Sequence, residues 1–438
     1  MFTVKDFHKP ERAFLVGVYP KSESKEEYEY RLSELKQLAD TAEIVVVDTF
    51  IQAMEKPDSA TLVGSGKLKE IIAKTEEHDI TTLIFNDNLS SSQARNIAKQ
   101  TKCNIVDRTE LILDIFAKHA QTHESKLQVE LAQLEYSYSK LRNLWQHFSR
   151  ITSGVGVGTR GPGEKQIEID RRLVRERIAI LKDRLKEITK TTDTKRKKRA
   201  NQISICLVGY TNAGKSTLFN LLTSEKIYAA DELFATLDAT TRSLNIDSKD
   251  EMVITDTIGF IENLPPTLIQ SFYSTLSEVR SADLLLHIVD VGHPKRDQMI
   301  ETTEKILKDI DAIDKDILMV FNKSDTFQTL HSKFEKKQLK NNHPDCIFIS
   351  AKTGENIETL REKIKIYIAK RKTLKKYIIP LDMRKTISFL HDNTEIKSFR
   401  YNYKNQTYEC ETLIDRKIEK NIQEQLDKNN LLKYINKK

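Results

Sequence analysis

The feature that most constrains the fold is an eight-residue glycine loop between a strand-like run and a helix-like run. Its residues match the pattern G-x-x-x-x-G-K-S: Gly209, Tyr210, Thr211, Asn212, Ala213, Gly214, Lys215 and Ser216. The apolar run 203–208 precedes the loop, and the helical pattern of 217–222 follows it. This order predicts a phosphate-binding loop, whose backbone N–H groups cradle phosphates. Lys215 would reach the β and γ oxygens, and the Ser216 hydroxyl would ligate Mg²⁺.

Three further motifs follow at the ends of predicted strands, in the order that a guanine-nucleotide site requires. They comprise Asp256, Thr257, Ile258 and Gly259; Asn322, Lys323, Ser324 and Asp325; and Ser350, Ala351 and Lys352. Asp256 can hold the Mg²⁺ shell through water, and the Gly259 N–H can sense the γ-phosphate. The Asp325 carboxylate can accept from guanine N1–H and from the exocyclic amine, a fit that adenine cannot supply. The third motif offers a backbone N–H to guanine O6, so GTP is the expected ligand.

These motifs resemble the translation-factor-related GTPases. A glycine-rich stretch at 158–165 extends the resemblance to HflX-type GTPases, a bacterial ribosome-associated family, over residues 10–370. In that superfamily a mobile-loop threonine closes over Mg²⁺ and the γ-phosphate. The matching stretch is Phe234, Ala235, Thr236, Leu237 and Asp238. The resemblance implies Ser216 and Thr236 as Mg²⁺ ligands and catalytic roles for Lys215, Thr236 and Gly259, although spacing alone leaves Thr240 and Thr241 as competitors for the threonine's role.

The alternation of patterns predicts an α/β protein of four parts. Residues 1–118 alternate strand-like and helix-like runs, which predicts a small N-terminal α/β domain with a parallel sheet. Residues 119–195 read as an antiparallel helical hairpin, and 201–370 as a P-loop GTPase domain with a mainly parallel sheet. Residues 374–438 predict a small α+β C-terminal domain without a catalytic constellation. A half-matching glycine stretch at 63–67 is interpreted as a helix start or turn rather than a second nucleotide site.

The predicted hairpin carries the clearest sign of a polyanionic partner. Two apolar stripes at heptad spacing, from Leu127 to Trp145 and from Ile167 to Ile188, flank a loop that holds five of the chain's 13 glycines. Residues 141–200 contain 17 Lys or Arg against 7 Asp or Glu. The candidate RNA-binding residues are Arg150, Gly154, Gly156, Gly158, Arg160, Gly161, Gly163, Lys165, Arg171 and Arg172. A flexible linker is the alternative interpretation of the loop.

The resemblance implies that this hairpin reaches into the large (50S) ribosomal subunit and contacts rRNA. The basic charge fits contact with phosphates and unpaired bases, although composition alone would allow tRNA or acidic protein equally well. The implied tasks are splitting of stalled ribosomes or subunit maturation. A signalling switch that binds protein or a membrane surface, and the GTPase component of an RNA-modification complex, are the alternatives.

Composition and cysteine placement bound the remaining properties. The sequence contains no apolar run near the ~20 residues that a membrane span needs, so no stable membrane insertion is expected. We expect a monomer in the cytoplasm. The alternative is that part of the protein binds peripherally to a membrane. The cysteines Cys103, Cys206, Cys346 and Cys410 lack C-x-x-C pairing, which argues against a zinc site or a disulfide framework. Cys206 and Cys346 are expected in buried strands.

The position after Gly259 departs from the usual hydrolytic pattern. A glutamine there usually orients the attacking water, but this chain has Phe260, which offers no polar side-chain atom. We therefore expect slow intrinsic turnover that a partner accelerates. A second hypothesis is that Asn212 helps to hold K⁺, which would serve in place of an arginine finger.

Overall fold

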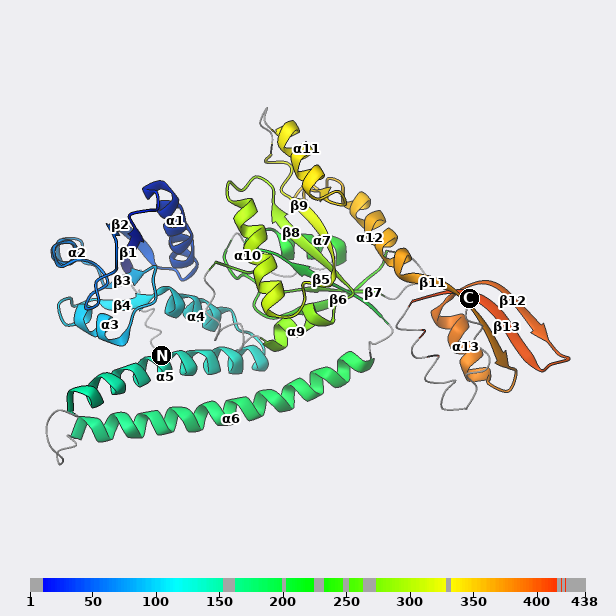
Figure 1. Ribbon diagram of the computed structural model, residues 1–438, viewed down its shortest axis with the longest axis horizontal. Coiled ribbons are helices and arrows are strands. Elements are labelled where there is room, and N and C mark those ends of the chain that lie inside the picture. Colours follow the sequence, from blue (N-terminus) through cyan, green and yellow to red (C-terminus); the bar gives the residue numbers. More distant parts are fainter. Residues whose placement is uncertain are drawn as a thin grey trace, which may run out of the picture. The chain divides into compact units, whose positions relative to one another are not determined.

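The computed structural model describes residues 11–152, 162–198, 202–223, 232–246, 252–262, 273–327 and 332–415, together with Glu419 and Ile422. Its contacts divide the chain into two compact units (Figure 1). The first unit comprises Met1–Lys190, Ala229–Asp238 and Ile261–Leu276, and the second comprises Thr191–Tyr228, Ala239–Phe260 and Ser277–Lys438. Two segments from the middle of the sequence thus group with the N-terminal unit.

A four-stranded parallel sheet forms the centre of the first unit, in the order β2-β1-β3-β4. The strands are β1 (Arg12–Pro20), β2 (Val45–Met54), β3 (Thr82–Phe85) and β4 (Asn104–Asp107). The connecting helices are α1 (Lys25–Thr41), α2 (Ser65–Glu77) and α3 (Ser91–Ala98). The predicted parallel α/β arrangement is confirmed. The half-matching glycine stretch starts helix α2: Gly64 is its N-cap and Lys67 pairs with Glu70.

Helix α4 (Arg108–His119) was not predicted, although the sequence carries its start signal. The Asp107 side chain accepts from the Glu110 backbone N–H, and the Glu110 side chain accepts from the Asp107 N–H. This is a capping box, in which two orphan donors at a helix start are satisfied reciprocally. Ser90 and Gln93 make the same arrangement at α3. The apolar side chains of α4, such as Leu111, Ile112 and Phe116, are almost fully buried.

Two long helices form the predicted hairpin within the first unit (Figure 1). They are α5 (His123–Thr152) and α6 (Pro162–Lys198). Leu127 and Leu131 of α5 pack with Leu181 of α6 in one apolar cluster. The pairs Glu130–Arg177 and Tyr138–Arg171 link higher positions in α5 to lower positions in α6, as antiparallel packing requires. The residues of the two heptad stripes whose side chains are described therefore pack in the core of the hairpin. The side chains of Trp145 and Ile167 are not among the described ones.

The second unit is built on a six-stranded sheet in the order β10-β9-β8-β5-β7-β6. All neighbouring pairs are parallel except β6 with β7. The strands are β5 (Ile203–Val208), β6 (Thr240–Leu244), β7 (Met252–Asp256), β8 (Leu284–Asp290), β9 (Asp316–Asn322) and β10 (Ile347–Phe348). The helices are α7 (Lys215–Thr223), α9 (Tyr273–Ser281), α10 (Arg296–Asp309), α11 (Ser332–Asn342) and α12 (Ile357–Arg371).

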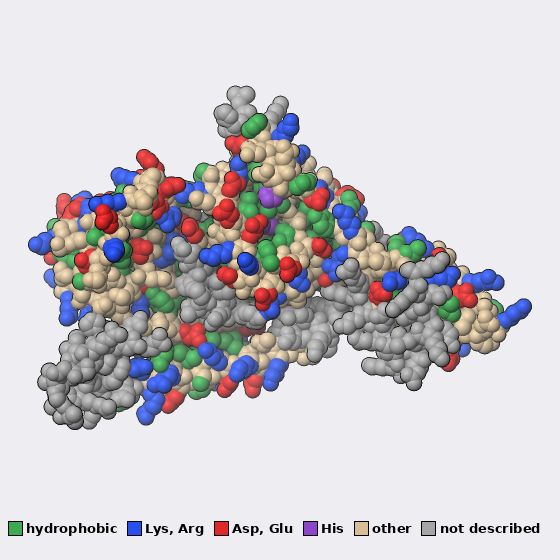
Figure 2. Space-filling model, viewed as in Figure 1, with side chains coloured by type: hydrophobic (Ala, Val, Ile, Leu, Met, Phe, Trp, Pro, Cys, Tyr) green, Lys and Arg blue, Asp and Glu red, His purple; other side chains and the backbone are tan. Residues whose placement is uncertain are grey.

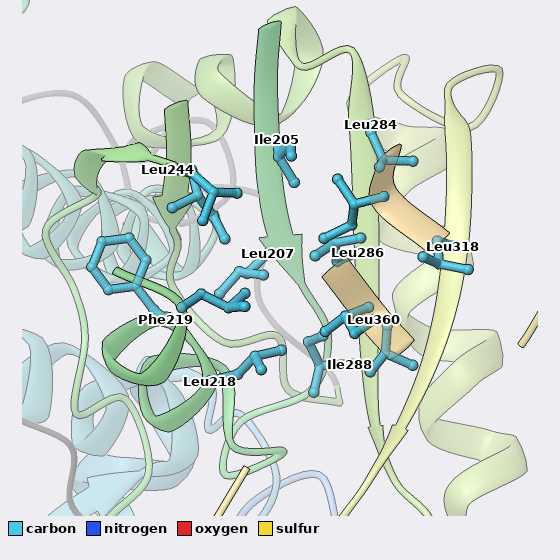
Figure 3. Close-up of a cluster of buried hydrophobic side chains, with 14 of the residues drawn as sticks. Ile205, Leu207, Leu218, Phe219, Leu244, Leu284, Leu286, Ile288, Leu318 and Leu360 are labelled. Carbon is cyan, nitrogen blue, oxygen red and sulfur yellow. The ribbon is translucent and has the colours of Figure 1, made fainter. Parts of the chain in front are cut away.

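The parallel strands of this sheet read as continuous apolar runs because both faces are covered. Figure 3 shows Leu207, Leu286 and Ile288 of the strands directed toward Leu218 of α7 and Leu360 of α12. All five side chains are inaccessible to solvent. Cys206 and Cys346 are buried in this unit, as expected. The core fixes the carboxyl ends of β5, β7, β9 and β10, where the sequence places its motifs.

A three-stranded antiparallel sheet follows α12 in the order β11-β13-β12. Its elements are β11 (Lys372–Pro380), α13 (Arg384–Asn393), β12 (Glu395–Asn402) and β13 (Thr407–Asp415). Tyr377, Tyr408 and Leu390 of α13 form its core. The predicted α+β character is confirmed for residues 374–415, whereas residues 416–438, apart from Glu419 and Ile422, lie outside the described residues. No helix in the described part of the chain is long and apolar enough to cross a membrane.

Candidate nucleotide site

The glycine loop adopts a conformation that only its glycines allow. Gly209 and Gly214 have φ angles of 143° and 91°. A Cβ atom would lie 2.2 Å from the Ile288 carbonyl oxygen at Gly209, and 2.2 Å from Asn322 Nδ2 at Gly214. Both positions therefore need the missing side chain as well as the unusual backbone. The loop runs from the end of β5 into α7, as the sequence predicts.

Lys215 is folded onto its own loop. Its Nζ donates to the carbonyl oxygens of Tyr210 at 2.7 Å and Gly209 at 3.2 Å. Burial lowers the pKa of Lys215 to about 8, against the opposing pull of the Asp256 carboxylate. A buried ammonium gains most from an anionic partner, because desolvation disfavours its charge. The geometry therefore suits an ammonium that binds phosphate oxygens.

Gly259 and Phe260 pair directly with the glycine loop. Phe260 N donates to Gly209 O at 3.1 Å, and Thr211 N donates to Phe260 O at 2.8 Å. A Cβ atom on Gly259 would lie 2.8 Å from Thr211 Cα and 2.9 Å from Lys215 Nζ. The Phe260 side chain is buried. Asp256 and Thr257, which precede them, are buried at the end of β7, where Thr257 Oγ1 donates to Leu207 O at 2.7 Å.

Asn322 joins two of the predicted motifs to the glycine loop. Its Nδ2 donates to Ala213 O at 2.8 Å, and its Oδ1 accepts from Ala351 N at 2.9 Å. The side chain is 2% exposed, so both hydrogen bonds are made away from water. Ser324 N also donates to Ile349 O at 3.0 Å. The structure thus brings the first, third and fourth motifs together around one buried amide.

Two buried polar atoms in these motifs await a partner. Asp325 Oδ1 and Thr211 Oγ1 are inaccessible to solvent and have no hydrogen-bond partner in the described part of the chain. Buried polar groups are normally satisfied, so each such exception needs an explanation. Hydrogen-bond donors on a bound guanine nucleotide would satisfy Asp325. Both atoms therefore support a ligand at this edge of the sheet.

Two supporting carboxylates were not predicted from the sequence. Asp290 at the end of β8 pairs with Lys323 Nζ at 2.9 Å, and Glu355 accepts from Ser324 Oγ at 2.9 Å. Ser350 and Lys352 lie in the turn beside Glu355, and Ser350 N donates to Glu355 O at 3.2 Å. Asp290 could have been found, because ligand-site residues gather at the carboxyl ends of parallel strands. Glu355 carries no such signal.

The structure separates the three threonines that spacing left in competition. Thr240 and Thr241 lie in β6, where Thr241 Oγ1 is 2.9 Å from Thr255 Oγ1 in the neighbouring strand. Thr236 instead lies in an irregular segment of the first unit and is half-buried. An irregular segment can move between two arrangements more easily than a strand in a sheet. Thr236 is accordingly the better candidate for the mobile-loop role.

The segment around Thr236 packs against the N-terminal unit. Leu233, Phe234 and Leu237 are buried, and the Phe234 ring meets Phe116 edge-on at 4.7 Å between centroids. Phe234 has a φ of 57°, a strained value for a bulky residue. On the other side of Thr236, the Asp238 carboxylate binds the start of α5. It accepts from Gln121 N at 3.1 Å, Thr122 N at 3.2 Å and Thr122 Oγ1 at 2.6 Å. Ala235, between Phe234 and Thr236, is half-buried.

A metal at this site would depend on the nucleotide. In the described residues, no group of three or more His, Cys, Asp or Glu side chains could hold a metal ion. The local donor set consists of the Ser216 hydroxyl, which follows Lys215 at the start of α7, and the buried Asp256 carboxylate. Hard oxygen donors in small number fit Mg²⁺, which usually binds through one or two protein oxygens plus substrate phosphates.

His287 of β8 is buried behind the glycine loop and is a structural residue. Burial lowers its pKa from 6.5 to about 3, helped by His343 and Lys215. The folded state therefore keeps His287 neutral, while the unfolded chain binds a proton below pH 6.5. The contribution of the neutral His287 to the free energy of unfolding is therefore fully present above pH 6.5 and is lost as the pH drops toward 3.

We expect the substitution His287→Gln to remove part of this acid sensitivity. Between pH 7 and pH 5 the wild type should lose about 2 kcal/mol more unfolding free energy than the variant, because only the wild type has this histidine to protonate on unfolding. Urea unfolding at both pH values, followed by circular dichroism, measures the difference. Equal losses in the two proteins would show that His287 is already protonated in the folded state.

The predicted RNA-binding residues are only partly described. Gly154, Gly156, Gly158, Arg160 and Gly161 lie outside the described residues, and for Arg150, Gly163 and Lys165 only the helical backbone is described. Arg171 and Arg175 lie against the Tyr138 ring, at 5.7 and 5.9 Å from its centroid. Arg172 is exposed and pairs loosely with Glu176 at 3.8 Å. Packing within the hairpin therefore accounts for part of this charge.

Comparison with protein families divides the chain into three matched stretches. Residues 29–117 match the family described as GTP-binding GTPase N-terminal, and residues 119–199 match GTP-binding GTPase Middle Region. Residues 204–323 match the family described as 50S ribosome-binding GTPase. The last stretch contains the glycine loop, the motif from Asp256 to Gly259, and the first two residues of the third motif, Asn322 and Lys323.

Curated relatives match the chain over most of its length. A protein of Flavobacterium psychrophilum named GTPase HflX is 42% identical over 372 residues, which cover 81% of this chain and 89% of that protein. GTPase HflX of Alkalihalophilus pseudofirmus is 40% identical and covers 92% of this chain and 93% of its own. A solved GTP-binding protein of Sulfolobus solfataricus in complex with GDP is 27% identical, with a TM-score of 0.43, over 82% of this chain and 99% of that one.

Proposed function

Because this chain belongs to the HflX family of GTPases and is a GTP-hydrolysing enzyme, we propose that it binds the large ribosomal subunit and acts in splitting stalled ribosomes or in subunit maturation. The family description of residues 204–323 supports this partner. The observation that supports nucleotide binding is the buried Asn322, whose side chain joins the glycine loop to the turn that begins at Ser350 and Ala351. Its place of action would be the cytosol, where a monomer meets ribosomes.

The proposed roles in hydrolysis follow the geometry of the glycine loop. Lys215 would exchange its two carbonyl partners for β and γ oxygens, and the Gly259 N–H would face the γ-phosphate. Ser216 and Thr236 would hold Mg²⁺, which when bound offsets the negative charge of the phosphates. Asp325 would read the guanine edge. Phosphoryl transfer needs little beyond positioning and charge stabilisation, so these groups supply most of what the reaction requires.

The missing water-orienting group is expected to come from the ribosomal subunit. The Phe260 side chain is 3% exposed and has no polar atom, and its backbone is already paired with the glycine loop. Intrinsic single-turnover hydrolysis should therefore be slow, and 50S subunits should accelerate it at least about tenfold. Quench-flow measurements with 50S subunits, and with 30S subunits as the matched control, measure the rates. Equal rates with and without 50S would reject the ribosomal subunit as the source.

A monovalent cation is the second proposed contributor. Asn212 sits in the glycine loop with a left-handed φ of 58°, at the position where some GTPases that lack the glutamine use an asparagine to hold K⁺. Replacing K⁺ by Na⁺ at constant ionic strength should slow hydrolysis about tenfold, because a cation of the wrong size leaves charge on the leaving group uncompensated. The variant Asn212→Ala should be slow in both salts. A wild type with the same rate in K⁺ and Na⁺ would exclude this role.

A further inference from the structure

The C-terminal part of the chain lies beyond the three matched family stretches, which end at residue 323. Residues 371–438 contain sixteen Lys or Arg against nine Asp or Glu, a net charge equal to that of the whole chain, +7. Figure 2 shows Lys and Arg side chains gathered at the outer end of this region. Within the described residues 371–415, nine are Lys or Arg and six are Asp or Glu, and a net positive charge favours a polyanionic partner. This charge is independent of the basic hairpin.

A row of exposed aromatic side chains follows strand β12. Phe399, Tyr401 and Tyr403 are 57%, 43% and 73% exposed. Phe399 and Tyr401 are alternate residues of the strand and so share one face, and Tyr403 follows in the turn after β12. The rings of Tyr401 and Tyr403 are nearly parallel, 6.2 Å apart with an interplanar angle of 21°, and Phe399 meets Tyr401 edge-on at 6.0 Å. Three large exposed rings in contact are unusual on a protein surface.

The row is supported from beneath by the core of the C-terminal sheet. Tyr408 of β13 is inaccessible to solvent; its ring lies 5.2 Å from that of Tyr401 and 6.1 Å from that of Phe399. The Tyr408 hydroxyl is fixed by a 2.8 Å hydrogen bond to His391 Nε2 of α13. Rigid aromatic rings lose little conformational entropy when a ligand stacks on them. The rings therefore form a platform rather than loose surface groups.

A cationic side chain lies beside these rings. Lys404 follows Tyr403 in the turn after β12; it is exposed and forms no ion pair with any described residue. Arg400, between Phe399 and Tyr401, lies on the opposite face of the strand, where it is opposite Glu409 in the strand register. Lys397 at the other end of the row pairs with Glu395 at 2.6 Å. The charge of Lys404 therefore remains available for a phosphate group.

We propose that this aromatic row, formed by Phe399, Tyr401 and Tyr403 with Lys404 at its end, binds unpaired RNA bases. Bases would stack on the rings while Lys404 contacts a phosphate beside them. Stacking on aromatic rings tolerates any base, so the surface reads single-strandedness rather than sequence. The inference rests on the proposed ribosomal function only for the source of the RNA. It adds a second RNA contact, separate from the hairpin.

A binding experiment on the full-length protein tests this surface directly. The probe is a fluorescent 12-nucleotide oligouridine, with a 12-base-pair RNA duplex as comparison, and anisotropy is recorded between 50 and 300 mM salt. Tyr403→Leu and Phe399→Leu keep an apolar side chain but remove the ring. Each should weaken oligouridine binding about tenfold. Lys404→Gln should reduce the salt dependence of binding, because one phosphate fewer is neutralised.

The matched control is Phe334→Leu, because Phe334 of α11 is also 73% exposed but has no aromatic row beside it. Its oligouridine affinity should equal that of the wild type. Unchanged affinity in Tyr403→Leu, an equal loss in Phe334→Leu, or preference for the duplex would overturn the proposal. Self-association that the same two aromatic variants abolish would identify β12 instead as an edge that pairs with a second copy. Sedimentation velocity separates that outcome.

Failure of this proposal is distinguishable from failure of the proposed function. Acceleration of GTP hydrolysis by 50S subunits depends on the glycine loop and its partners, and Tyr403→Leu leaves those residues intact. If 50S subunits accelerate hydrolysis but oligouridine binding is unaffected by the aromatic variants, only the C-terminal surface is rejected. If the variants lose oligouridine and the wild type ignores 50S subunits, the ribosomal function is rejected and the RNA surface remains.

Discussion

Replacing Asp325 by asparagine is expected to weaken GTP binding about 10³-fold and to make xanthosine triphosphate the preferred ligand. The carboxylate can accept two hydrogen bonds from guanine, from N1–H and from the exocyclic amine. Asparagine keeps one acceptor and turns the other into a donor, which meets the guanine amine unfavourably. Hydrogen bonds to a charged group are worth about 1.5–3 kcal/mol each, and the mismatch adds a desolvation cost. The xanthine 2-oxo group accepts from the new donor.

The structure supports this prediction because Asp325 Oδ1 is buried and lacks a partner in the described chain, so it has no competing hydrogen bond to give up. Equilibrium dialysis or fluorescent-nucleotide displacement with GDP, GTP and their xanthosine counterparts measures the change. Asp290→Asn is the matched control, because Asp290 pairs with Lys323 rather than facing the base. It should weaken guanine and xanthine nucleotides alike. An Asp325→Asn variant that retains its guanine preference would place the base elsewhere.

Replacing Gly214 by alanine should raise the dissociation constant for GTP and GDP at least about 10²-fold. A Cβ atom there would lie 2.2 Å from Asn322 Nδ2, so the amide must leave its position. Asn322 would then lose its hydrogen bonds to Ala213 O and Ala351 N, and the glycine loop would separate from the guanine-side turn. Each buried hydrogen bond lost costs about 1–3 kcal/mol. Isothermal titration with GDP measures the affinity.

Gly354→Ala is the control that isolates backbone strain from the clash. Gly354 has a φ of 83°, close to that of Gly214, but no atom lies within 4 Å of its missing Cβ. This variant should lose only about 1 kcal/mol of stability, the cost of a left-handed backbone for an alanine. If Gly354→Ala and Gly214→Ala weakened GDP equally, strain rather than displacement of Asn322 would explain the loss.

Local patterns in the sequence were sufficient for most of the architecture. Residues 203–208 were predicted as a strand with the observed bounds, because continuous apolar runs bounded by turns favour buried parallel strands. The heptad stripes predicted the packing of Leu127 and Leu131 against Leu181. Three elements were missed: α4, β6 and α11. Strand β6 is short and lies antiparallel at the edge of the sheet. Its Thr-rich sequence shows no strong periodicity of apolar residues.

The sequence located the motifs but did not show how they contact one another. Nothing in the spacing of Asn322 indicates that its side chain binds Ala213 and Ala351, since the three meet only through the folded sheet. The choice of Thr236 over Thr241 likewise needed the pairing of β6 with β7. The aromatic row of β12 was read only as strand, because its exposure depends on which residues α13 covers. Local periodicity determines elements, whereas tertiary contacts determine which side chains remain for ligands.

The anchoring of residues 233–238 changes what a truncation experiment on this protein can mean. This segment is joined covalently to the nucleotide-binding unit, yet it contacts the buried Phe116 and the two residues that precede α5, Gln121 and Thr122. Excising residues 1–190 would leave Phe234 and Leu237 without their apolar surroundings and Asp238 without its three donors. Such a fragment would therefore present residues 233–238 without the contacts that hold them in the intact chain. Its rate of hydrolysis would depend on this altered segment as well as on the nucleotide-binding motifs.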